Sequence, residues 1–79
     1  MTDTERLREA IKQRGLKIGW IAEQMGLAPW SFTRKMNNVT DFTAREIQLC
    51  SALLGIGKRE RNAIFFAKDV EDVSTRREA

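Results

Sequence analysis

The chain has 79 residues and a formal net charge of +3; 42% of its residues are hydrophobic and 32% are charged. This length allows one small domain, and the balance of apolar and charged residues is typical of globular rather than disordered proteins. Only five glycines and one proline are present, which disfavours a turn-rich β-sandwich or barrel. We therefore expect an all-α fold, a compact five-helix bundle over residues 1–68 followed by a charged tail over residues 69–79.

Several function classes are disfavoured by residues that the sequence lacks. There is no histidine, so a Ser-His or Cys-His nucleophile pair cannot form, and we expect no enzyme activity, cofactor or small-molecule substrate. Cys50 is the single cysteine, which disfavours a zinc site and rules out an internal disulfide. No apolar run reaches the roughly 20 residues of a membrane span. We expect a cytoplasmic protein without metal or membrane partners.

Two short helices are predicted in the first third of the chain. Thr2-x-x-Glu5 matches a capping box and marks the start of the first, which ends at Gly15. Its apolar residues recur at helical spacing: Leu7, Ala10 and Ile11. A second helix is expected over residues 17–25, where apolar residues repeat at i, i+3, i+4 and i+7. Gly26 follows and permits a tight change of direction.

A third helix is predicted to begin at Pro29, because proline at the first helical position loses no hydrogen bond. Phe32 and Met36 form its apolar i, i+4 pair. The helix is expected to end at Asn37 and Asn38, since asparagine tolerates the left-handed conformation.

The fourth helix has the clearest start in the sequence. Thr43 and Glu46 form a second capping box, and Phe42 before it matches a hydrophobic staple with Ile47. Gly55 is expected to close the helix.

A fifth helix is predicted over residues 59–68. Residues 63–67 are all apolar, which is more than one helical stripe, so part of this surface is expected to pack against the tail or a partner chain. Ile64, Phe65 and Phe66 are therefore candidates for a homodimer interface.

Positive charge is concentrated in the first half of the chain. Between residues 12 and 45 there are two acidic groups, Glu23 and Asp41. The same segment holds six basic groups: Lys12, Arg14, Lys17, Arg34, Lys35 and Arg45. A local cationic field of this kind suits a polyanion such as nucleic acid, although charge alone is equally consistent with a solvated surface.

The second and third predicted helices, separated by a glycine turn, have the spacing of a helix-turn-helix unit. Its characteristic segments are Gly15-Leu16, Ile21-Ala22-Glu23-Gln24-Met25-Gly26-Leu27, Ser31-Phe32-Thr33-Arg34, Arg34-Lys35-Met36-Asn37-Asn38 and Phe42-Thr43-x-x-Glu46-Ile47. In these segments the chain resembles the lambda-repressor/Cro-like (XRE-type) regulators, small phage and prophage repressors above all. The resemblance implies sequence-specific binding of double-stranded DNA and transcriptional repression, with residues 29–37 in the major groove. Pro29 and Trp30 depart from the polar residues usual at the start of that helix.

Helical geometry selects the residues of the third helix that can contact DNA. At 100° per residue, Phe32 and Met36 share one side, while Trp30 and Arg34 lie on the other. The candidates for base contacts are Pro29, Trp30, Thr33 and Arg34. Arg34 can donate two hydrogen bonds to guanine, and Trp30 can cover a thymine methyl group. Alternatively, Arg34 contacts phosphate or solvent alone, and Trp30 packs on a neighbouring helix or partner.

Further polar residues flank this helix and are candidates for phosphate contacts, which position a protein without specifying sequence. They are Lys17, Lys35, Asn37, Asn38, Thr40 and Arg45. A second hypothesis assigns the same surface to a protein-interaction module that binds a transcription component or a repressor. Pro29, Trp30 and the Phe65-Phe66 pair fit such a contact as well as they fit DNA. Binding to duplex DNA distinguishes the two.

Overall fold

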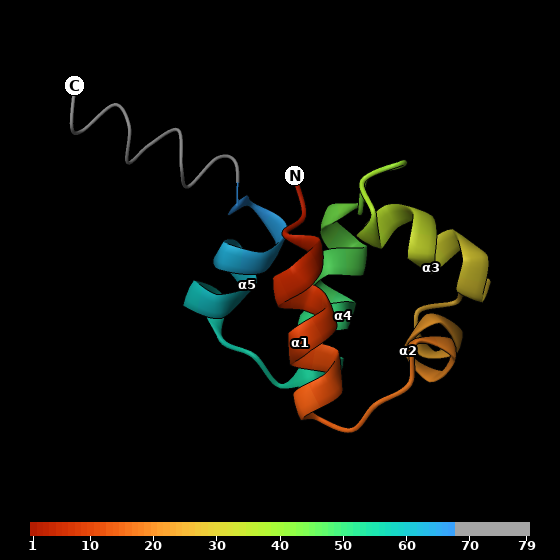
Figure 1. Cartoon of the computed structure of the whole chain (residues 1–79), viewed down its shortest axis with the longest axis horizontal. Helices are drawn as coiled ribbons and strands as arrows, with labels where there is room; N and C mark the ends of the chain where they lie inside the picture. Colours follow the sequence, from red (N-terminus) through yellow and green to blue (C-terminus); the bar gives the residue numbers. More distant parts are fainter. Residues whose placement is uncertain (68–79) are drawn as a thin grey trace.

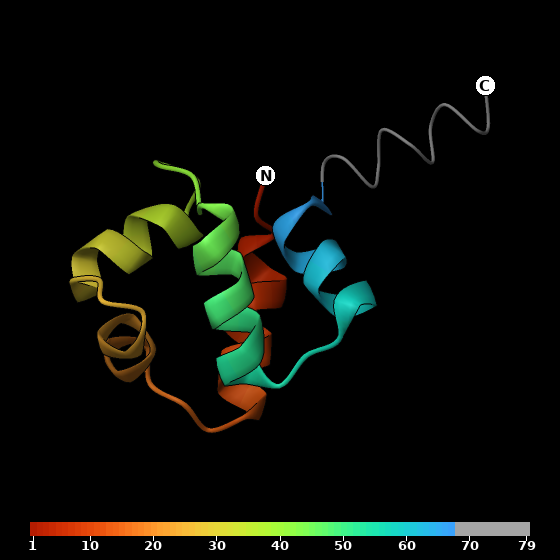
Figure 2. The same cartoon turned by 180° about the vertical axis from the view of Figure 1, so that it is seen from behind.

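The computed structural model describes residues 1–67, which form five α-helices and no strand. The helices are α1 (Thr4–Gln13), α2 (Ile18–Gln24), α3 (Pro29–Met36), α4 (Ala44–Leu54) and α5 (Lys58–Phe65). In Figures 1 and 2, α1 and α4 lie in the middle, with α2 and α3 to one side and α5 to the other. The predicted all-α fold with five helices is confirmed. The predicted charged tail, residues 69–79, lies outside the described residues.

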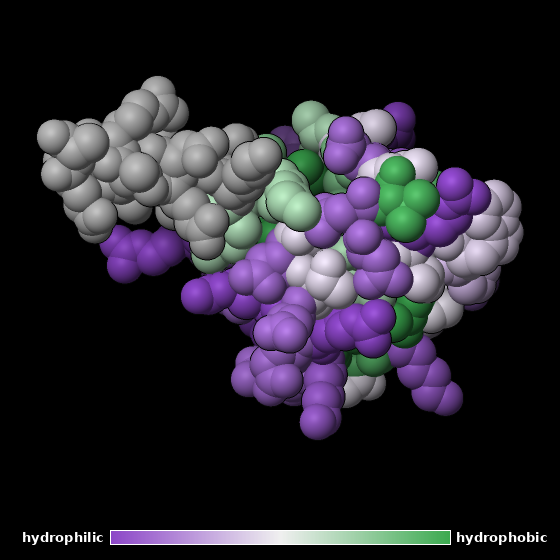
Figure 3. All heavy atoms as spheres, turned by 45° about the horizontal axis from the view of Figure 1, so that its top comes forward, coloured by the Kyte–Doolittle hydropathy of each residue, from purple (hydrophilic) through white to green (hydrophobic). Residues whose placement is uncertain are grey.

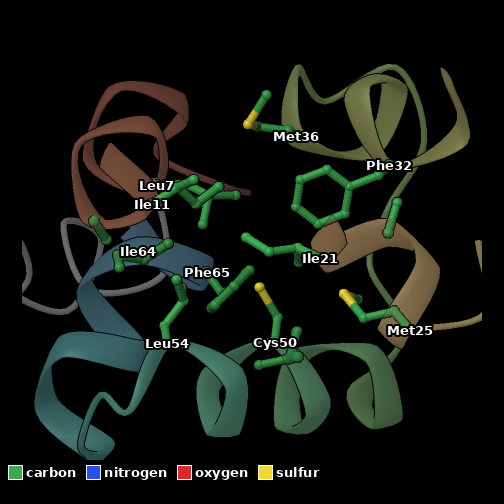
Figure 4. Packing of buried hydrophobic residues seen from close by; sticks show 13 residues of the cluster. Leu7, Ile11, Ile21, Met25, Phe32, Met36, Cys50, Leu54, Ile64 and Phe65 are labelled. Atoms are coloured by element: carbon green, nitrogen blue, oxygen red, sulfur yellow. The ribbon is translucent and has the colours of Figure 1, made fainter. Parts of the chain in front are cut away.

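All five helices contribute to one hydrophobic core (Figure 4). Its buried members are Leu7, Ala10, Ile11, Ile21, Ala22, Met25, Phe32, Met36, Ile47, Cys50, Leu54, Ile64 and Phe65. The ring of Phe42 lies edge-on to Phe32, with centroids 5.6 Å apart, and to Phe65, with centroids 5.3 Å apart. This aromatic chain joins α3 to α5 across the loop that precedes α4.

Cys50 behaves as a small buried apolar residue. Its side chain is fully buried, and this burial raises the pKa of the thiol to about 12. The thiol therefore stays protonated at neutral pH, as expected for a structural cysteine.

The predicted capping box and glycine terminator of α4 and the predicted proline start of α3 are confirmed. The Thr43 hydroxyl accepts from the Glu46 N–H at 3.2 Å, while the Glu46 carboxylate accepts from the Thr43 N–H at 2.9 Å. Gly55 ends α4 with φ +67°, in the left-handed region that favours glycine. Pro29 is the first residue of α3.

Two predicted helix boundaries are wrong. The N-cap of α1 is Asp3, whose carboxylate accepts from the Arg6 N–H at 3.1 Å; Thr2, the expected cap, is buried instead. The helix predicted over residues 59–68 is α5, which begins at Lys58 and ends at Phe65. Within residues 1–67, no helix has the length and apolar character needed to cross a membrane.

Candidate nucleic-acid interface

A short turn joins α2 to α3 and sets their relative position. Gly26 occupies it with φ +73°, a conformation that side-chain-bearing residues rarely adopt. The N–H of Leu27 donates to the carbonyl of Ala22 at 2.8 Å, which closes the turn over the end of α2. Ala22 is fully buried, so a small side chain stands where the two helices meet the core.

Helix α3 has one buried and one open face. Phe32 and Met36 are 0% exposed, whereas Trp30 is 66% exposed and Arg34 is also exposed. The guanidinium carbon of Arg34 lies 5.9 Å from the centre of the Trp30 ring, within the range of a cation–π interaction. The predicted orientation of the helix is therefore confirmed, and two candidate base-contact residues lie together on its open face.

The other two candidates for base contacts lie beside this pair. Pro29 is exposed. Thr33 is half-buried, and its hydroxyl donates to the Pro29 carbonyl at 3.1 Å. The Thr33 hydroxyl is thus partly satisfied within the helix and is a weaker candidate for base contact than Arg34.

Four of the six candidate phosphate contacts are exposed to solvent. They are Lys17, Asn37, Thr40 and Arg45. Lys17 is the N-cap of α2, but its ammonium has no acceptor atom with which to cap the helix, and it forms no ion pair within residues 1–67. The Asn37 side chain accepts from Arg8 of α1 at 3.5 Å. No local pattern in the sequence indicates that Arg8 reaches the end of α3.

Lys35, also a candidate, is used inside the fold. Its ammonium lies 3.1 Å from the Glu46 carboxylate and donates to the Asp41 carbonyl at 2.9 Å. Burial raises the pKa of Glu46, but hydrogen bonds from Thr43 and Lys35, together with the Lys35 charge, lower it by more. The net pKa lies below its ordinary value of 4.5. This ion pair ties the last turn of α3 to the first turn of α4.

Asn38 is likewise held by the protein itself. It has φ +65°, as expected for a left-handed helix terminator. Its side-chain amide forms two hydrogen bonds of 2.9 Å with the backbone of Thr2. A phosphate oxygen would have to displace these bonds, so Asn38 is better placed to fix the end of α3 than to bind DNA.

The three residues predicted to form a dimer interface differ in their exposure to solvent. Ile64 and Phe65 are 2% and 3% exposed in the core of the chain itself, whereas Phe66 is half-buried. Only Phe66 offers appreciable surface to a second chain. Among residues 1–67, no group of three or more acidic or cysteine side chains is arranged to hold a metal ion.

The six basic residues between positions 12 and 45 differ in how they are used. Arg14 donates to the Leu54 carbonyl and lies 3.9 Å from the Glu60 carboxylate, so it helps to hold α1, α4 and α5 together. Four others are exposed and form no ion pair within residues 1–67: Lys12, Lys17, Arg34 and Arg45. Hydrophilic side chains also cover much of the face in Figure 3, with small apolar areas between them.

No protein-family model, curated protein or solved structure matches this chain. The candidate interface is therefore defined by its own geometry: a short helix with a buried edge, an open edge that carries Trp30 and Arg34, and exposed cations nearby.

Proposed function

We propose that this chain binds double-stranded DNA sequence-specifically, as a helix-turn-helix protein of the lambda-repressor/Cro-like type with α3 in the major groove. The observation that carries the proposal is the open face of α3. Trp30 and Arg34 project to solvent there, opposite Phe32 and Met36, which are completely buried.

The chemistry of this face suits base recognition. The planar guanidinium of Arg34 can donate to both O6 and N7 of guanine, and the indole of Trp30 offers an apolar surface to a thymine methyl. The eight residues of α3 include no acid, so the helix carries no charge that repels phosphate.

Lys17 and Arg45 supply the sequence-independent part of the interaction. Both are exposed and form no ion pair within the described chain, so their charges can neutralise phosphates. Each neutralised phosphate should contribute about 0.9 to the slope of log affinity against log salt concentration.

The proposed biological role is repression by occupancy, in which the bound protein blocks access to the site. A homodimer on two half-sites roughly 34 Å apart would extend the recognised sequence. This dimer is a separate prediction, and Phe66 is its most accessible candidate contact. Sedimentation that shows a monomer both free at high concentration and on DNA would exclude it.

Fluorescence anisotropy of a labelled 30-base-pair duplex tests the proposal. The protein should bind a random duplex weakly at low salt and a selected duplex more tightly. Arg34→Ala should weaken binding to the selected duplex by about 1–3 kcal/mol. Arg59→Ala is the matched control, because Arg59 is an exposed arginine on α5, on the other side of the α1–α4 pair from α3 (Figure 1). Equal effects of the two substitutions would contradict the assigned face.

A protein-interaction module remains a second candidate because two tryptophans are exposed, Trp30 at 66% and Trp20 at 43%. Exposed aromatic residues often anchor protein contacts. Such a module would leave the anisotropy of every duplex unchanged at low salt. It would instead bind a purified transcription component, such as RNA polymerase, and lose that binding on Trp30→Ala.

A further inference from the structure

We propose that Trp30 and Arg34 act as one unit that recognises a thymine next to a guanine. Trp30 covers the 5-methyl group of the thymine, and Arg34 donates to the guanine of the adjacent base pair. This inference rests on the proposed DNA binding and extends it by naming the two bases.

The spacing of the two side chains limits how far apart their targets lie. They are four residues apart on α3, and their Cα atoms are therefore separated by about 6 Å along the helix axis. The Arg34 guanidinium carbon also lies only 5.9 Å from the centre of the Trp30 ring. Stacked base pairs are about 3.4 Å apart. Two groups about 6 Å apart span less than two base-pair steps, so they reach neighbouring base pairs, not pairs several steps apart.

Contact with the indole leaves the hydrogen-bonding edge of Arg34 available. A guanidinium that stacks on an aromatic ring still presents its N–H donors at its edges. Arg34 has no carboxylate partner within residues 1–67 to occupy those donors. In the major groove guanine presents two adjacent acceptors, whereas adenine pairs an acceptor with a donor. Arg34 therefore selects guanine.

Trp30 recognises the second base, the thymine, through its methyl group. Trp30 is 66% exposed, and thymine carries the only methyl group that the four standard bases present in the major groove. Burying one methyl group against the indole should strengthen binding about fourfold at each site. Uracil lacks this methyl group but pairs identically, so replacing thymine by uracil removes this contact alone.

The cation–π contact also couples the guanine contact of Arg34 to the thymine contact of Trp30. The indole holds the guanidinium near one orientation before DNA arrives, which lowers the conformational cost of the guanine contact. Loss of Trp30 should therefore weaken the preference for guanine as well as the preference for the methyl group. Loss of Arg34 should abolish the guanine preference.

The test selects binding sites from 30-base-pair duplexes with a randomised centre and then replaces each thymine of the best site by deoxyuridine. The selected sites should contain thymine adjacent to guanine. Deoxyuridine at that thymine should weaken binding of the unmodified protein about fourfold and leave binding of Trp30→Ala unchanged. Trp20→Ala is the matched control, since it removes the other exposed indole, and it should keep the fourfold effect.

The results that would overturn the two-base proposal differ from those that would overturn DNA binding. Sites that are selected without an adjacent thymine and guanine, or a Trp30→Ala variant that still distinguishes thymine from uracil, would overturn the two-base proposal and leave DNA binding intact. Failure to enrich any duplex, with the protein folded by circular dichroism, would overturn the proposed DNA binding and this inference with it.

Discussion

The side-chain amide of Asn38 pairs with both backbone groups of Thr2, 36 positions earlier in the chain. The Thr2 N–H donates to Asn38 Oδ1, and Asn38 Nδ2 donates to the Thr2 carbonyl, both at 2.9 Å. The Thr4 hydroxyl adds a bond of 2.7 Å to the Met36 carbonyl. The start of α1 thus holds the end of α3, and this anchoring positions the open face of α3.

Asn38→Ala should lower the free energy of unfolding by about 2–4 kcal/mol. Alanine removes two hydrogen bonds and also disfavours the φ of +65° at this position. Asn38→Gly removes the same hydrogen bonds but adopts positive φ freely, and should cost about 1–2 kcal/mol less than alanine. Urea unfolding of the three proteins measures the difference. Equal stability of the alanine variant and the unmodified chain would refute the role given to this pair.

Two glycines should respond to alanine in opposite directions. A Cβ at Gly26 or at Gly19 would meet nothing within 4 Å, so packing does not distinguish them. Gly26 has φ +73°, and Gly26→Ala should destabilise the protein by about 1 kcal/mol. Gly19 lies within α2 without positive φ, and Gly19→Ala should stabilise by about 0.5–1 kcal/mol. Thermal unfolding checks the signs; a stabilising Gly26→Ala would contradict the turn geometry.

The Lys35–Glu46 ion pair predicts a pH dependence of stability. Because the pKa of Glu46 is lowered from 4.5, its charged form stabilises the folded state above pH 4.5, and this contribution is lost as the pH falls through the lowered pKa. Glu46→Gln keeps a capping residue but removes the charge. Its stability deficit, of about 1 kcal/mol or less, should be present at neutral pH and shrink as the pH falls below 4.5 through the lowered pKa of Glu46. A deficit that is constant with pH would show that the charge is irrelevant.

Lys17 and Lys35 should affect DNA binding in different ways. Lys17→Ala should leave unfolding unchanged and reduce the salt slope of DNA affinity by about 0.9, because the exposed Lys17 is free to neutralise a phosphate. Lys35→Ala should instead destabilise the fold, since the ammonium binds Glu46 and the Asp41 carbonyl. Salt titrations and urea unfolding separate the two effects. A reduced slope for Lys35→Ala alone would reverse the assignment.

Much of the fold could be predicted because its signals are local. The capping box of Thr43 and Glu46 lies within one helical turn, and the pattern that places Phe32 opposite Trp30 depends only on helical geometry. The open face of α3, on which the candidate site depends, follows from that same pattern.

The features that could not be predicted depend on partners that lie far apart in the sequence. Thr2 matched a cap locally, but tertiary contacts with Asn38 bury it and leave Asp3 to cap α1. The ion pair of Lys35, in the last turn of α3, could not be predicted either, because its partner Glu46 stands 11 positions later, on the next helix. Local patterns do not contain such pairings, which depend on how the helices pack.

Contact between the open face of α3 and duplex DNA can be measured directly, because the chain contains two tryptophans and one of them, Trp30, lies on that face. In a ¹⁵N-labelled sample the indole N–H groups of Trp20 and Trp30 give separate signals, which Trp20→Phe assigns. Adding a selected duplex at low salt should shift the Trp30 signal, and high salt should reverse the shift. A Trp30 signal that stays in place while the duplex is bound, or the absence of any shift at saturating duplex, would contradict the claim.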